Sequence, residues 1–209
     1  MLEKDQPRTV YWLENNLYLN ITNRCSNHCI FCFRNFKNGI GDFVLKLKKE
    51  PSSEQVIEEL KENTGRRAWK EIVFCGFGEP LERLDCLIEV AKWIRRSYGK
   101  PIKIRVNTNG HGYLLNPGRE VASELRAAGV NKVSVSLNAH DEETYNEVCR
   151  PAFAGAYAAV LEFIEKAKGK LDVEVTAVTT PEVDLHEVKD LAGRMGVKFR
   201  MRPCIPCFW

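Results

Sequence analysis

Short apolar stretches alternate with longer amphipathic stretches along this chain, which predicts that strands and helices alternate. A buried strand shows a short apolar run or a period of two, whereas a helix shows apolar residues three and four positions apart. The predicted strands are residues 9–12 and 16–22, which can pair as a hairpin, followed by 71–75, 102–107, 132–138, 171–179 and 197–202. The predicted helices are 53–63, 81–97, 117–128, 141–149, 154–168 and 183–195. Helices between consecutive strands favour parallel pairing.

The number of these units predicts the fold class. A full barrel closes with eight strand–helix units and takes ~250 residues, whereas this chain has about six units in 209 residues. We therefore predict an α/β fold, a partial (three-quarter) TIM-like barrel of about six parallel strands with outer helices. Because no repeat, low-complexity tract or linker divides the chain, we expect one domain over residues 1–209, with its core at about 16–202.

One face of the predicted strands is polar. In the strand 132–138, valine and leucine alternate with Ser134, Ser136 and Asn138. The same alternation places basic side chains on the polar face of two other strands, namely Arg105, Lys198, Arg200 and Arg202. Helices must cover the apolar face. The polar face then has two interpretations: it is exposed to water, or it lines an open lumen that binds a polar, anionic molecule.

Composition and charge exclude few functions. Hydrophobic residues make up 44% and charged residues 28%, which is ordinary for a globular protein. A formal net charge of +3 is too small to indicate nucleic acid binding by itself. We expect no membrane association, because no apolar run approaches the ~20 residues that span a bilayer. The charged N-terminus lacks an apolar signal core, so we expect a cytoplasmic location.

Three of the eight cysteines lie close together, at Cys25, Cys29 and Cys32. Such clustering indicates a metal site, and three thiolates from one tight loop can hold an iron–sulfur cluster with one iron left open. An open coordination position is typical of catalytic metal sites. Two alternatives remain: a zinc site with His28 as a ligand, and buried thiols without a metal. Cys204 and Cys207 form a second pair, either an auxiliary metal or redox site or two ordinary thiols.

Three segments carry a resemblance to a known family. The spacing C-x3-C-x2-C follows the first long strand, with Phe31 before its last cysteine. The segments Cys-Gly-Phe-Gly-Glu-Pro at 75–80 and Asn-Thr-Asn-Gly at 107–110 follow the next two strands. Together these motifs resemble the radical SAM superfamily over nearly the whole chain. The short length and the lead-in sequence at 18–25 resemble the small radical SAM proteins associated with TatD-type nucleases.

The resemblance implies an enzyme with two cofactors, a [4Fe–4S] cluster and S-adenosyl-L-methionine (SAM). The reduced cluster cleaves SAM to a 5′-deoxyadenosyl radical, which abstracts hydrogen from a small-molecule substrate that the resemblance leaves unidentified. It implies iron binding by Cys25, Cys29 and Cys32, and SAM binding by Phe31, Gly76, Gly78, Glu79, Asn109, Ser136, Asn138 and Arg150. No catalytic side chain is assigned. The implied partners are an electron donor such as flavodoxin or ferredoxin, and a TatD-type nuclease.

Two other functions stay open at this level. One is an activating enzyme that installs a glycyl radical on a partner protein, and the other is a zinc-binding module without turnover. The basic segment 33–49, which follows the cysteines, is either a lid over the substrate or a solvated connection.

Overall fold

A seven-stranded sheet forms the centre of the computed structural model, which describes residues 6–65, 68–99 and 101–204. The strands, in their order across the sheet, are β1 (Val10–Leu13), β2 (Asn16–Leu19), β5 (Glu71–Phe74), β6 (Lys103–Thr108), β7 (Lys132–Ser136), β8 (Asp172–Val178) and β9 (Lys198–Arg202). Strand β1 pairs with β2 in an antiparallel hairpin, and every later pair is parallel. The predicted hairpin and the six parallel strands are therefore confirmed.

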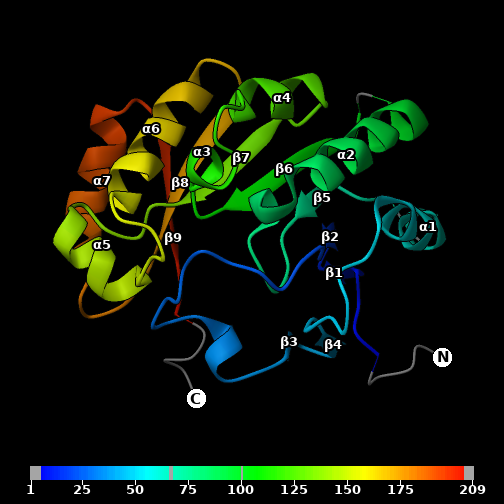
Figure 1. The fold of residues 1–209 in the computed structure, drawn as a ribbon, viewed down its shortest axis with the longest axis horizontal. Coiled ribbons are helices and arrows are strands. Elements are labelled where there is room, and N and C mark those ends of the chain that lie inside the picture. The colour runs from blue at the N-terminus through cyan, green and yellow to red at the C-terminus, as the bar shows by residue number, and fades with distance from the viewer. Residues whose placement is uncertain (1–5, 66–67, 100, 205–209) are drawn as a thin grey trace.

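The helices line one side of this sheet, and residues 20–50 lie on the other side (Figure 1). The long helices are α1 (Ser53–Thr64), α2 (Leu84–Tyr98), α4 (Val121–Ala127), α5 (Glu142–Cys149), α6 (Ala156–Lys168) and α7 (Leu185–Arg194). Shorter elements are α3 (Gly112–Leu115), the 3-10 helices η1 (Phe33–Asn35) and η2 (Pro80–Arg83), and the hairpin of β3 (Gly39–Ile40) and β4 (Phe43–Val44). Among the helices of the described residues, none combines the length and apolar character needed to cross a bilayer.

The predicted alternation of the strands is confirmed by burial. On β7 and its extension, Val133, Val135 and Leu137 are completely buried in the main apolar cluster, together with Leu87 and Ile94 of α2. The polar residues between them point to the opposite face, because successive side chains of a strand alternate. That face lines the cavity described below. One side of the sheet thus holds the core, and the other side is left for polar chemistry.

Two predicted helices begin three or more residues later than expected. The helix predicted over 117–128 starts at Val121, because Pro117 and Gly118 form a turn in which Gly118 has φ of 76°, a left-handed conformation. The helix predicted over 81–97 is divided into η2 and α2. The short helix α3 was not predicted, since a single turn leaves no periodic pattern in the sequence.

The segment after the cysteines packs against the start of the sheet. Leu45 and Leu47 are buried, and the side chain of Asn20 donates to the carbonyl oxygen of Leu45 over 2.7 Å. The amide of Asn23 donates to the carbonyl oxygen of Leu47 over 2.7 Å and accepts from its N–H over 3.0 Å. These bonds hold residues 45–47 beside the residues that lead into the cysteine loop. Whether the segment opens as a lid stays a prediction.

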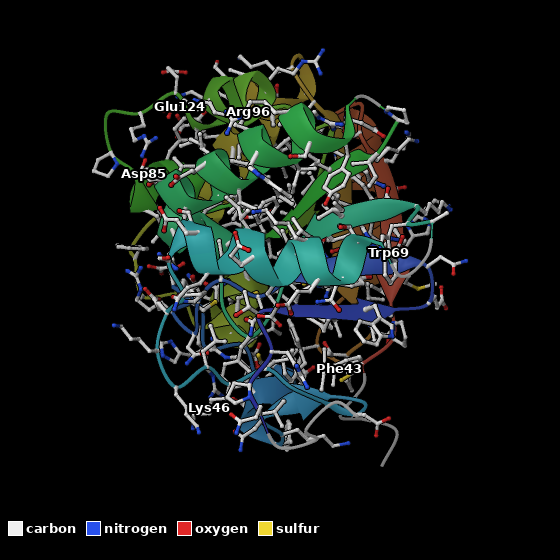
Figure 2. The ribbon with its side chains drawn as sticks, turned by 90° about the vertical axis from the view of Figure 1, so that its right-hand side faces the viewer. Phe43, Lys46, Trp69, Asp85, Arg96 and Glu124 are labelled. Atoms are coloured by element: carbon white, nitrogen blue, oxygen red, sulfur yellow. The ribbon has the colours of Figure 1, made fainter. Side chains whose placement is uncertain are left out.

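We expect Arg95→Met to lower the free energy of unfolding by about 2–4 kcal/mol, because the Arg95 guanidinium holds three backbone regions together. It donates to the carbonyl oxygens of Gly99 and Gly129 over 2.9 and 2.8 Å and to the side chain of Asn131. Urea denaturation of cluster-free protein measures the change. Arg96→Met, on the exposed face of the same helix (Figure 2), should change it by less than about 0.5 kcal/mol. Equal losses would contradict this role for Arg95.

Candidate functional site

A cavity of about 240 Å³ lies where the parallel strands end, and the cysteine loop forms one of its walls. The opposite walls come from the turn after β5 and from the ends of β6, β7, β8 and β9. Ligands of parallel α/β folds bind at this edge, because the strand ends and the loops converge there. All but one of the predicted site residues line it: Cys25, Cys29, Phe31, Cys32, Gly76, Gly78, Glu79, Asn109, Ser136 and Asn138.

The cysteine loop is held in place by its backbone. The N–H groups of His28 and Ile30 donate to the carbonyl oxygens of Cys149 and Val148, each over 3.0 Å. The N–H of Cys32 donates to the carbonyl oxygen of Cys29 over 3.1 Å, which closes a tight turn between these two cysteines. The thiols of Cys25, Cys29 and Cys32 are unpaired and half-buried. All three line the same cavity, so a ligand bound there can contact them together.

The cysteine thiols lose their protons less readily than an ordinary cysteine does, so a metal must displace these protons when it binds. Burial raises the pKa of Cys25 to about 12 and also raises the pKa of Cys32, although the neighbouring Arg34 acts in the opposite direction on both. Metals bind the deprotonated thiolate and release the proton. Three half-buried thiols on one wall, beside a guanidinium, fit a cluster whose irons supply the compensating positive charge.

A mononuclear zinc site has less support. Among the described residues, no group of three or more His, Cys, Asp or Glu side chains could hold a single metal ion. All ligands of one zinc ion must lie ~2.0–2.3 Å from a single point, whereas a cluster binds each thiolate to a different iron. His28, the predicted fourth zinc ligand, is exposed and lies outside the cavity lining.

The two glycines of the turn after β5 are required by close packing. A Cβ at Gly76 would lie 2.2 Å from Oδ1 of Asn20, and a Cβ at Gly78 would lie 2.3 Å from the carbonyl oxygen of Arg24. Contacts this short do not occur, so any larger residue would push the turn away from residues 20–24. The N–H of Phe77 also donates to Oδ1 of Asn20 over 2.8 Å. The glycines thus bring this wall of the cavity against the lead-in to the cysteine loop.

Glu79 is buried and accepts three hydrogen bonds from the protein. Its carboxylate accepts from the N–H of Leu81 over 3.1 Å, from the hydroxyl of Thr108 over 2.8 Å and from the N–H of Asn109 over 2.6 Å. Burial raises the pKa of Glu79 to about 7, although these donors favour the charged form. A carboxylate has about four acceptor positions. One position therefore remains for a ligand in the cavity.

Sequence analysis missed a buried hydrogen-bond network behind the cysteine loop. The amide of Asn109 donates to the hydroxyl of Ser26 over 2.8 Å, and Ser26 Oγ lies 2.9 Å from Nδ1 of His111. The other ring nitrogen of His111 lies 2.9 Å from the hydroxyl of Tyr145, which also accepts from Asn27 over 3.2 Å. Burial lowers the pKa of His111 to about 4, so this ring is neutral. The only sequence signal was the pair of small polar residues inside the cysteine motif.

Arg150 is the predicted site residue that does not line the cavity. Arg150 ends α5 in a left-handed conformation with φ of 46°, its side chain is exposed, and it is absent from the cavity lining. Arg202 at the end of β9 brings a guanidinium into the cavity instead. Its Nη2 donates to Ser136 over 3.2 Å and to Oδ1 of Asn138 over 3.4 Å. The strand alternation had placed Arg202 on the polar face, but it could not show the contacts of Arg202 with Ser136 and Asn138. Those contacts form only in the folded sheet, where β7 and β9 lie on either side of β8.

The remaining cysteines differ in where they lie. Cys75 lines the cavity. Cys86 and Cys149 are buried helix residues, and the Cys149 thiol accepts from the amide of Asn138 over 3.4 Å. Cys204 is buried after β9, and Cys207 lies outside the described residues. The proposed role of the Cys204–Cys207 pair therefore stays a prediction.

Known proteins resemble this chain in sequence and in fold. A probable GTP 3′,8-cyclase of Halobacterium salinarum is 29% identical over 99% of this chain and 54% of its own length. An AdoMet-dependent heme synthase of Methanosarcina barkeri is 27% identical over 91% of this chain and 48% of its own length. The chain therefore spans about half the length of these relatives. A crystal structure of Streptococcus suis SuiB bound to S-adenosylmethionine superposes with a TM-score of 0.69 at 15% identity, covering 91% of this chain and 41% of SuiB.

The match to a family model covers most of the chain. The model described as "Radical SAM superfamily" matches residues 19–195, a range that includes the cysteine motif and every strand from β5 to β8. The parallel sheet with outer helices agrees with the fold of the solved structure. The chain therefore belongs to the radical SAM superfamily.

Proposed function

We propose that this protein binds a [4Fe–4S] cluster and SAM in the cavity and abstracts hydrogen from a small-molecule substrate. The observation that carries the proposal is that three free thiols, a glycine–glutamate turn and the polar ends of four strands line one cavity. When bound, the cluster and SAM supply a carbon-centred radical. The protein positions the reacting groups and excludes water, as proteins do around reactive cofactors.

Each wall of the cavity has its own role in this proposal. Cys25, Cys29 and Cys32 would hold the cluster, and the methionine end of SAM would bind beside it. The free acceptor position of Glu79 receives the amino group of that end, since a carboxylate accepts strongly from an ammonium donor. Further ligand contacts come from Phe31 against adenine, from the Gly76, Gly78 and Asn109 backbone, and from Ser136 and Asn138 toward the ribose.

The substrate does not follow from the relatives. Their names, GTP 3′,8-cyclase and AdoMet-dependent heme synthase, describe different reactions. The chain also matches only about half of each of them. Neither the glycyl-radical activase nor the zinc module gains support from the comparisons.

Two partners belong to the proposal. An electron donor such as flavodoxin or ferredoxin would reduce the cluster. A positively charged surface for such a donor comes from the exposed side chains of Lys46, Lys48 and Lys49. These lysines lie near the cysteine loop, because Leu47 is hydrogen-bonded to Asn23. Association with a TatD-type nuclease is supported only by the lead-in sequence at 18–25 and by the short length.

Cys29→Ala should abolish both cluster binding and SAM cleavage, because the two remaining thiolates are too few to hold the cluster. Iron content and 5′-deoxyadenosine formation are measured after anaerobic reconstitution with dithionite and SAM. Cys86→Ala removes a buried thiol that lies outside the cavity lining and should leave both quantities close to wild type. SAM cleavage by Cys29→Ala at the wild-type rate would refute the assigned ligand set.

Glu79→Gln should raise the Kd for SAM about tenfold to hundredfold above pH 7, because a charge-assisted hydrogen bond contributes ~1.5–3 kcal/mol. Since the Glu79 pKa is about 7, the carboxyl becomes protonated as the pH falls below that value, and this advantage is lost. The affinities of wild type and variant should therefore converge toward pH 6. Equilibrium dialysis with labelled SAM measures the ratio, which cancels the titration of SAM itself.

Glu82→Gln is the matched control for this experiment. Glu82 lies three residues along the chain, pairs with Arg24 over 3.5 Å and is absent from the cavity lining. We expect its affinity ratio to stay near one at every pH. A Glu79→Gln ratio that is constant from pH 6 to pH 8 would argue against a charged contact between Glu79 and SAM.

A further inference from the structure

Three of the four basic side chains predicted on the inner face of the sheet have acidic partners. An ion pair joins each of them to a carboxylate within 3.0 Å: Arg105 to Glu71, Lys198 to Asp172 and Arg200 to Glu174. Glu174 also pairs with Lys132 over 3.0 Å. These pairs largely cancel the local charge, so the three residues offer little attraction to an incoming anion.

Arg202 differs from the other three. Within the described part of the chain its guanidinium contacts no carboxylate, and its recorded partners are all neutral. Nε donates to the hydroxyl of Thr176 over 3.1 Å, and Nη2 donates to Ser136 over 3.2 Å and to Oδ1 of Asn138 over 3.4 Å. A guanidinium has five N–H donors in a rigid fork. The two donors on Nη1 have no recorded acceptor among the described residues.

The position of this guanidinium makes its unpaired charge significant. Arg202 lines the cavity and is half-buried, and burial lowers its pKa. A charge removed from water is costly unless an opposite charge compensates it. The three neutral acceptors orient the fork without neutralising it. A planar or tetrahedral oxyanion would supply both the missing charge and two acceptors, in the geometry that arginine binds best.

The other titratable groups of the cavity supply little counter-charge. The Cys75 thiol interacts with Arg202, but burial raises the pKa of Cys75 and so favours its neutral form. Glu79 already accepts three hydrogen bonds from the turn after β5 and from the end of β6. Arg34 lies at the cysteine wall, where it donates to the carbonyl oxygens of Asn23 and Phe77 over 3.2 and 3.3 Å. In the sheet, β9 lies four strands from β5. The amino and carboxylate groups of SAM share one carbon, so an amino group at Glu79 keeps the carboxylate near Glu79. The charge of Arg202 is also felt at Cys75, directly after β5, so the SAM affinity of Arg202 variants must be measured as well.

We propose that Arg202 binds an oxyanion of the substrate, a carboxylate or a phosphate, at the β9 wall of the cavity. This inference rests on the proposed function, because it assigns the methionine end of SAM to the Glu79 wall. It narrows the substrate to an anionic metabolite whose charged group lies away from the methionine end of SAM.

The test uses full-length, cluster-loaded protein saturated with SAM, at constant ionic strength. Inorganic phosphate and acetate, each isotopically labelled, are titrated by equilibrium dialysis, and the tighter of the two identifies the anion class. Arg202→Gln should weaken binding of that anion at least about tenfold, the loss expected for one charge-assisted contact. Arg202→Lys keeps the charge but loses the fork, so its loss should be smaller. Arg200→Gln, at a paired neighbour on the same face, should change affinity less than about threefold.

The affinity for SAM is measured in parallel. We expect Arg202→Gln to bind SAM within about threefold of wild type, because a contact outside the SAM site contributes little to its affinity. Three results would overturn the proposal: neither anion saturates the wild-type site, Arg200→Gln and Arg202→Gln weaken it equally, or Arg202→Gln loses SAM affinity instead. Failure of the proposed function is distinguishable, because wild-type protein would then lack iron or produce no 5′-deoxyadenosine, whatever the anion result.

Discussion

The close approach of the turn at residues 76–79 to the chain at residues 20–24 is the constraint on which the site depends. Gly76 and Gly78 leave no room for a side chain against Asn20 and Arg24. The N–H of Glu79 donates to the carbonyl oxygen of Arg24 over 2.7 Å, directly before the first cysteine. This contact places the start of the cysteine loop beside Glu79. Without it, the thiols and the turn would not line the same cavity.

Buried polar groups hold the rest of the cysteine loop, together with the packing of Ile30 and Phe31 against the main apolar cluster. Ser26 and Asn27 lie between the cysteines and bond through His111 and Tyr145 to α3 and α5. Because the ring of His111 is neutral and both its nitrogens have partners, the network satisfies buried polar groups without placing another charge beside the thiols. A buried network of this kind, in which Asn27 Oδ1 lacks a hydrogen-bond partner among the described residues, orders a loop that has no secondary structure of its own.

Charge is distributed unevenly across the cavity. Carboxylates neutralise the basic residues at the start of the inner face, as Glu71 does for Arg105 and Glu174 for Arg200. The end of β9 is different, because Arg202 is held by hydroxyl and amide oxygens alone among the described residues. The cavity therefore holds a carboxylate, Glu79, in the turn after β5, and a guanidinium without a carboxylate partner among the described residues at the end of β9. This distribution of charge suits two ligands bound together, with the amino group of SAM at Glu79 and an anionic group of the substrate at Arg202.

Local sequence patterns were enough to predict the strands, most helices and the cluster of three cysteines. These features are local: the period-two alternation of 132–138, the capping box that starts α1 at Ser52 and the spacing of Cys25, Cys29 and Cys32 all arise within a few residues. Only the tertiary structure decided which guanidinium enters the cavity, why Gly76 and Gly78 cannot be larger, and what holds the cysteine loop. Each of these depends on contacts between residues far apart in the chain, such as Arg202 with Ser136 or Asn20 with Gly76, and local periodicity carries no information about them.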